Sequence, residues 1–121
     1  MLSDDAVLLL RVVNPRWVQA GKVTSQVFAE FDGKPISMFD GSMISAKDAF
    51  DRFSEEHDAF GVIGITVGEL RSAGVEIIED RKPYVEHISI RLPDVSRSEK
   101  KRISGRLRDV AMARGWLYIK P

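Results

Sequence analysis

The feature that most constrains the fold is the run LLLRVV at residues 8–13, because it places an arginine inside an apolar stretch. A continuous apolar run that ends in β-branched residues predicts a strand, over residues 6–13, covered on both faces. A guanidinium stays charged, and removing it from water without a partner is expensive. We therefore expect Arg11 to bind an anion, which is either an acidic side chain of this chain or a ligand. The alternative is that the side chain extends to solvent at a sheet edge.

Short apolar runs closed by turn residues recur along the chain. They predict strands at residues 6–13, 22–31, 36–39, 61–65, 75–79, 84–92 and 116–119. The strand at 22–31 is expected because Val23, Ser25 and Val27 alternate with residues of the opposite side. The strand at 84–92 alternates in the same way, which predicts one buried and one solvent-facing side.

Three capping patterns, each a Ser or Thr followed three residues later by an acid, begin helices at Ser45, Thr66 and Ser96. Gly74 and Gly115 are natural helix ends. The fold class expected from these elements is α+β, with a mixed or antiparallel sheet of about six to seven strands covered by two main helices and one short helix. We expect it to form a single domain over residues 1–121.

The composition excludes several kinds of functional site. The 121 residues are 44% hydrophobic and contain no cysteine, which excludes disulfides, thiolate zinc sites and cysteine nucleophiles. With only two histidines, His57 and His87, we expect no metal and no cofactor. The N-terminus MLSDDAVLLL carries acids where a secretory signal has Lys or Arg, and no apolar run is long enough to span a membrane. These features predict a cytoplasmic protein with no membrane partner.

The net charge is zero but unevenly distributed: residues 97–121 carry eight bases and two acids, a net charge of +6, and residues 1–96 carry −6. In the predicted last helix Lys101 and Arg108 lie seven residues apart, and Arg102 and Arg106 lie four apart. These four bases are candidates for contact with nucleic acid or with a protein partner. No aromatic residue lies between them to stack on bases, so a solvated basic face is the alternative.

Three aromatic residues, Trp17, Trp116 and Tyr118, are candidates for an interface with a partner, because Trp and Tyr are favoured as interface anchors. Burial in the core is the alternative reading. Among motifs, the chain contains no G-x-x-x-x-G-K-[ST], G-x-G-x-x-G, H-E-x-x-H or G-x-S-x-G. The absence of a catalytic motif favours a non-enzymatic protein.

Two stretches, VNPRWVQAGKVTSQVF (13–28) and ARGWLYIKP (113–121), resemble a group of small uncharacterised bacterial proteins with an LLLR strand, an SQ-F motif and an RGW-Y end. The resemblance implies a bacterial protein but no activity. In outline, Arg11 and Ser25 also resemble the arginine–serine–glutamate arrangement of ADP-ribosyltransferases, in which Glu69 or Glu86 would supply the glutamate. That resemblance implies an anion site at Arg11 and Ser25.

Three functions follow as hypotheses. The first is a non-enzymatic protein-interaction module of the bacterial cytoplasm, such as an immunity protein, an antitoxin or an accessory subunit. Under this hypothesis the partner is another protein, and a second copy of the same chain is an alternative partner. The second is a nucleic-acid-binding module that uses the basic C-terminal helix. The third is a small ADP-ribosyltransferase-like or nucleotide-handling enzyme that uses Arg11 and Ser25.

Overall fold

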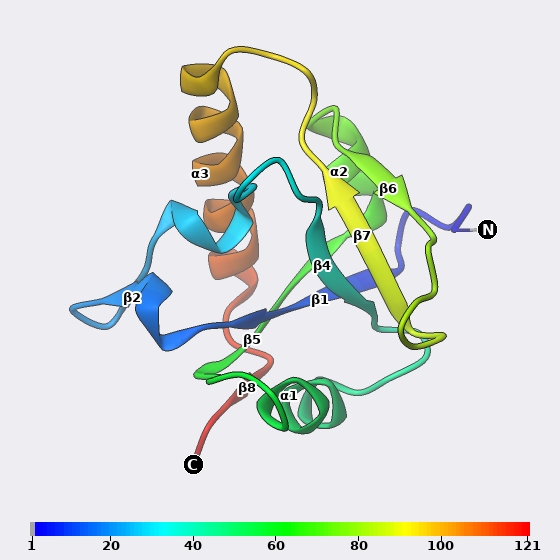
Figure 1. The fold of residues 1–121 in the computed structure, drawn as a ribbon, viewed down its shortest axis with the longest axis vertical. Helices are drawn as coiled ribbons and strands as arrows, with labels where there is room; N and C mark the ends of the chain where they lie inside the picture. The colour runs from blue at the N-terminus through cyan, green and yellow to red at the C-terminus, as the bar shows by residue number, and fades with distance from the viewer. Residues whose placement is uncertain (1) are drawn as a thin grey trace.

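A computed structural model describes residues 2–121 of the chain (Figure 1). The strands are β1 (Leu8–Val13), β2 (Val18–Gln19), β3 (Lys22–Val23), β4 (Ile36–Asp40), β5 (Gly61–Thr66), β6 (Glu76–Ile78), β7 (His87–Arg91) and β8 (Tyr118–Ile119). The α-helices are α1 (Ala46–Ser54), α2 (Val67–Ser72) and α3 (Arg97–Arg114), and two 3-10 helices are η1 (Pro15–Trp17) and η2 (Ser25–Phe28).

Six strands form one antiparallel sheet in the order β6-β7-β4-β1-β5-β8, and β2 and β3 form a separate hairpin. Strand β1 lies inside the sheet and pairs with β5 along its whole length, from Leu8 opposite Thr66 to Val13 opposite Gly61. The predicted α+β class with an antiparallel sheet, two main helices and one short helix is confirmed.

Both faces of β1 are buried, as the apolar run predicts. Leu9 and Val13 belong to a core shared with α2, η2 and α3, whereas Leu10 and Val12 belong to a second core shared with α1. The sheet therefore lies between α1 on one face and η2, α2 and α3 on the other. The charged side chain of Arg11 leaves β1 on the α3 side, between Leu9 and Val13 in the alternation.

The helix ends lie where the capping patterns predict them. Thr66 and Glu69 form a reciprocal capping box on α2, and the hydroxyls of Ser45 and Ser96 accept the third backbone N–H of α1 and α3. Gly115 ends α3 with a positive φ of 92°, a conformation that favours glycine. Within residues 2–121 no helix combines the length and apolarity needed to cross a membrane.

The predicted strand at residues 22–31 is wrong. Only Lys22 and Val23 are extended, in a hairpin with β2, and the chain then turns into η2. Val27 and Phe28 are consecutive and both fully buried, which a strand with one covered face would not allow. Their carbonyls bind side chains instead of a ladder: Val27 O accepts from Arg11 Nε, and Phe28 O accepts from Ser104 Oγ at 2.7 Å.

The strand predicted at 84–92 is shorter than expected, because a turn occupies its first residues. The backbone N–H of His87 donates to Tyr84 O at 3.1 Å, and β7 begins only there. From His87 on, the core side is as expected, because Ile88 and Ile90 are fully buried with α3. The other side is not wholly in solvent as predicted, since Ser89 is also buried. The Tyr84 ring of this turn stacks on Phe39, which belongs to β4.

Two glycines give a matched stability test. A Cβ on Gly61 would lie 2.6 Å from Tyr118 O and 2.8 Å from the Trp116 ring, so Gly61→Ala must displace β8. We expect it to lower the free energy of unfolding by about 1–3 kcal/mol. Gly105 lies inside α3, and a Cβ there would have Arg108 Nη2 as its nearest neighbour, at 3.9 Å. Because alanine favours a helix more than glycine does, Gly105→Ala should raise the free energy of unfolding by about 1 kcal/mol. Urea denaturation measures both, and equal signs would contradict the packing described for Gly61.

Candidate functional site

The Arg11 side chain fills a gap in the sheet. The β1–β4 ladder has only two residue pairs and stops at Leu10 opposite Phe39, while β4 continues beside β7. Beyond that point, hydrogen bonds from the Arg11 guanidinium connect β1 to β4 and to η2. Arg11 Nη1 donates to Ser37 O of β4 at 2.8 Å, and Nε donates to Val27 O of η2 at 2.8 Å. Its Cζ lies 4.6 Å from the centroid of the Trp17 ring, a cation–π distance.

No acid neutralises this cation within the described part of the chain. Arg11 is only 7% exposed, and among residues 2–121 it forms no ion pair, so its polar partners are two neutral carbonyls. Burial lowers the pKa of Arg11 to about 10, which still leaves the guanidinium charged at neutral pH. The internal salt bridge that would have satisfied Arg11 is therefore absent from residues 2–121.

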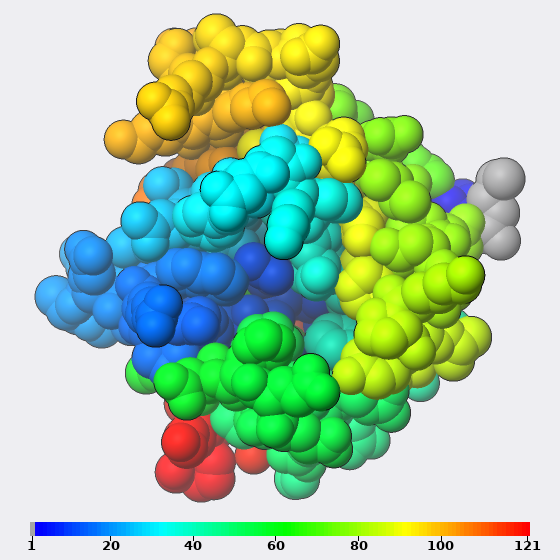
Figure 2. Space-filling view, in the orientation of Figure 1, coloured from blue at the N-terminus to red at the C-terminus, as the bar shows by residue number. Residues whose placement is uncertain are grey.

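Arg11 leaves β1 on the side of η2 and α3, but it also lies at the floor of a pocket of about 160 Å³ whose other lining residues, such as Val12 and Phe53, belong to the α1 side of the sheet. Its guanidinium lies in the gap beyond the β1–β4 ladder, where it donates to Ser37 O and borders both sides of the sheet. Figure 2 looks into a hollow whose bottom has the dark blue of the β1 region, with green and yellow-green segments on its rim. The lining residues come from β1, β4, the end of α1 and the turn before β7, and they are Arg11, Val12, Ser37, Phe39, Arg52, Phe53, Glu56, His57, Pro83, Tyr84 and His87. We call it the central pocket.

The walls of the central pocket are aromatic and basic. The Tyr84 ring stacks on Phe39 with centroids 6.4 Å apart, and Arg52 Cζ lies 4.5 Å above the Tyr84 ring. Arg52 also forms an ion pair with Glu86. The pocket is thus lined by two arginines, two histidines and one carboxylate, which makes it a favourable place for an anion.

An acid orients His87 at the edge of this pocket. His87 Nδ1 lies 2.8 Å from Asp80 Oδ1, and Ser89 Oγ donates to the other oxygen of the same carboxylate. Burial raises the pKa of Asp80, but the hydrogen bonds from Ser89 and His87 outweigh it, so the pKa lies below its ordinary value. A carboxylate at Nδ1 fixes the ring, and an imidazole held in this way can exchange a proton with a bound group or donate to it.

The residues of the arginine–serine–glutamate outline lie apart from one another. Ser25 begins η2 and lines a groove beside α3 rather than the central pocket. Glu69 caps α2 and pairs with Arg114, and Glu86 pairs with Arg52. Of these residues, only Arg11 lines the central pocket.

The four predicted bases of α3 divide into two pairs. Lys101 and Arg108 line the groove between α3 and the segment from β2 to η2, and Arg108 also pairs with Asp109 at 2.9 Å. Arg102 is exposed and pairs with Glu99 of the same helix at 3.0 Å. Arg106 is exposed and lines neither part of that groove.

The three predicted interface aromatics are half-buried, each against another ring. Trp17 stacks on Phe31 with centroids 6.4 Å apart and lies under Arg11. In tilted pairs, Trp116 lies 5.3 Å from Phe60 and Tyr118 lies 5.0 Å from Phe50. Each therefore contributes to packing and keeps part of its surface in solvent.

Sequence reasoning missed most of the central pocket. It identified Arg11 but not Ser37, Phe39 or Tyr84, because the register of β4 and the turn before β7 bring these together. The one signal that pointed there was the alternation at 84–92, which placed His87 on the side away from the core of Ile88 and Ile90.

In comparisons with known proteins, no family model, no curated protein and no solved structure matches this chain. Among residues 2–121, no group of three His, Asp or Glu side chains is arranged to hold a metal ion. We therefore infer the function from the geometry of the central pocket itself.

The Asp80 contacts give a pH-dependent stability prediction. Because the pKa of Asp80 in the folded state lies below its ordinary value of 3.8, its contribution is present above pH 3.8 and is lost as the pH falls through the folded pKa. We expect Asp80→Asn to lower the free energy of unfolding by about 1 kcal/mol at neutral pH, a charged hydrogen-bond value reduced for partial exposure. The difference from wild type should shrink below pH 3.8.

Urea titrations at neutral and acid pH measure this difference. Asp94→Asn is the matched control, because Asp94 is exposed and forms no ion pair within residues 2–121. A wild-type advantage over Asp80→Asn that stays constant down to about pH 2.5 would contradict the assignment.

Proposed function

We propose that this protein binds a small organic anion in the central pocket, with a carboxylate or phosphate group directed at Arg11. The observation that supports the proposal is the charge of Arg11: a nearly buried guanidinium, on the floor of a pocket, whose polar partners in residues 2–121 are two carbonyls. An enclosed charge without a counter-ion is costly to keep, so an anion that enters the pocket gains a strong electrostatic partner.

The chemistry of the walls suggests the rest of the ligand. Phe39, Phe53 and Tyr84 offer flat apolar surface, and His87 with Arg52 offers further donors at the rim. A ligand with an acidic group and a small planar or apolar body satisfies both parts of the lining. A volume of about 160 Å³ limits the enclosed part to a compact group such as a ring.

The third sequence hypothesis, a nucleotide-handling enzyme, is compatible with such a ligand only if Arg11 acts without Ser25, which lines a different surface. His87 with Asp80 is the pair that would move a proton on a bound molecule. Binding of the anion is the function that the geometry supports best, and any reaction would follow from it.

Thermal unfolding with a panel of small carboxylates and phosphates, from inorganic phosphate and benzoate to adenosine monophosphate, tests the proposal. A ligand at about 100 times its Kd stabilises the folded state by about 2.7 kcal/mol. For a chain of this size each kcal/mol raises Tm by roughly 3–6 °C. We expect at least one member of the panel to raise Tm by several degrees, and Arg11→Met to abolish that rise.

Arg106→Met is the matched control, since it removes one exposed guanidinium outside the pocket and should leave the rise intact. Arg11→Met also loses two hydrogen bonds and can unfold, so His87→Gln is the second pocket variant, with a smaller expected rise. The proposal is wrong if no anion stabilises the wild type, or if both pocket variants respond as the wild type does.

A further inference from the structure

A second concave surface runs along α3 on the side of the sheet opposite the central pocket. Two adjoining hollows of about 450 and 650 Å³ share Ser25 and together form one groove between α3 and the segment from β2 to η2. From Arg97 to Met112, at 1.5 Å per residue, the groove is about 22 Å long. We call it the α3 groove.

The α3 groove has a positive charge that the chain leaves unneutralised. Its lining includes five basic and two acidic side chains, a net charge of +3: Lys22, Arg97, Lys100, Lys101 and Arg108 against Glu30 and Asp109. Both acids are already engaged: Glu30 Oε1 lies 3.2 Å from Lys100 Nζ, and Asp109 pairs with Arg108.

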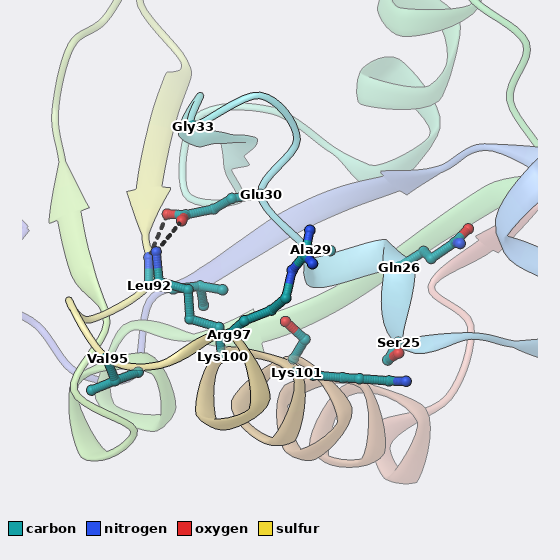
Figure 3. A pocket seen from close by; sticks show the side chains of 11 residues that line it. Ser25, Gln26, Ala29, Glu30, Gly33, Leu92, Val95, Arg97, Lys100 and Lys101 are labelled. Atoms are coloured by element: carbon teal, nitrogen blue, oxygen red, sulfur yellow. Dashed lines mark hydrogen bonds and ion pairs between the residues drawn. The ribbon is translucent and has the colours of Figure 1, made fainter.

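Arg97 and Lys101 project into the groove, and within residues 2–121 neither has an acidic partner. Figure 3 shows both side chains extending from α3 across the first hollow, that of Lys101 toward Ser25, while Glu30 is tied to Lys100 and to the backbone N–H of Leu92. The two residues are four apart on α3, so they lie on one face of the helix.

The floor of the α3 groove is apolar. Ala29, Leu92 and Val95 line the first hollow, and Val95 is 40% exposed, while Val23 and Met112 line the second. A surface that alternates aliphatic floor and cationic rim is complementary to a chain that carries aliphatic and acidic side chains in turn.

Nucleic acid fits this surface less well than such a peptide does. No aromatic side chain lines either hollow to stack on bases. The whole chain has a net charge of zero, and residues 1–96 carry −6, which would repel a long polyanion. A short acidic segment needs only the local charge of the groove.

We propose that the α3 groove binds an acidic segment of a partner protein in an extended conformation. At about 3.3 Å per residue, about six or seven residues span the groove. Carboxylates of the segment pair with Arg97 and Lys101, and its aliphatic side chains pack against Leu92, Val95 and Met112. This site is independent of the central pocket. It is the surface through which the protein would act as the protein-interaction module that the sequence suggests.

Peptide display tests the proposal with the full chain as bait. A random library of about 12-residue peptides should yield binders enriched in Asp and Glu interspersed with aliphatic residues. The best peptide, labelled with fluorescein, is then measured by anisotropy. We expect the double variant Arg97→Glu, Lys101→Glu to weaken Kd by at least about tenfold, since charge reversal replaces attraction by repulsion. Val95→Ser should weaken it severalfold by removing apolar contact.

The matched control is Arg102→Glu with Arg106→Glu, which makes the same charge change on a different face of α3 and should leave Kd within about twofold. Circular dichroism verifies that both double variants fold. Arg11→Met should leave peptide binding intact where it folds, so failure at one site is distinguishable from failure at the other.

Four results of the binding experiments would overturn the proposal. They are no enriched peptide, enriched peptides without acids, equal loss in both double variants, and a thymidine oligonucleotide that binds more tightly than the peptide at the same groove. A dimer in sedimentation that the groove variant dissolves would also overturn it, because the occupant would then be a second copy of this chain.

Discussion

The rest of the structure depends on the guanidinium of Arg11. Strand β1 pairs with β4 for only two residues, and past that point the hydrogen bonds of Arg11 to Ser37 O and Val27 O join β1, β4 and η2. A planar group with donors in a fixed fork can satisfy two carbonyls at once, and the guanidinium also lies over the Trp17 ring. This arrangement encloses a positive charge, which is unfavourable without a counter-ion. The central pocket is the place where a ligand can reach that charge.

The two proposed sites lie on opposite faces of the sheet and share η2 as a wall or support. From one side Arg11 binds the carbonyl of Val27, and from the other Ser104 of α3 binds the carbonyl of Phe28. These two bonds satisfy consecutive carbonyls that have no strand partner, so η2 can be buried without a ladder. The same segment then presents Ser25 and Gln26 to the α3 groove.

Cationic charge is used differently at the two sites. In the central pocket Arg11 is fixed by carbonyls and an indole ring before any ligand arrives, which favours a compact, well-defined anion. In the α3 groove Arg97 and Lys101 extend from an exposed helix face, with conformational freedom to lose on binding. A flexible rim over an aliphatic floor suits an extended segment rather than a small molecule.

The sequence by itself determined the class of fold, the buried first strand and the helix boundaries, because hydrophobic periodicity and capping are local properties of a few adjacent residues. It identified Arg11 as the residue that needs a partner. The tertiary structure decided what that partner is, since Ser37 and Val27 reach Arg11 through strand register and through a 3-10 turn that resembled a strand in its alternation. It also decided that Lys101 faces a groove and Arg102 does not, because only the packing of α3 on η2 defines which helix face is concave.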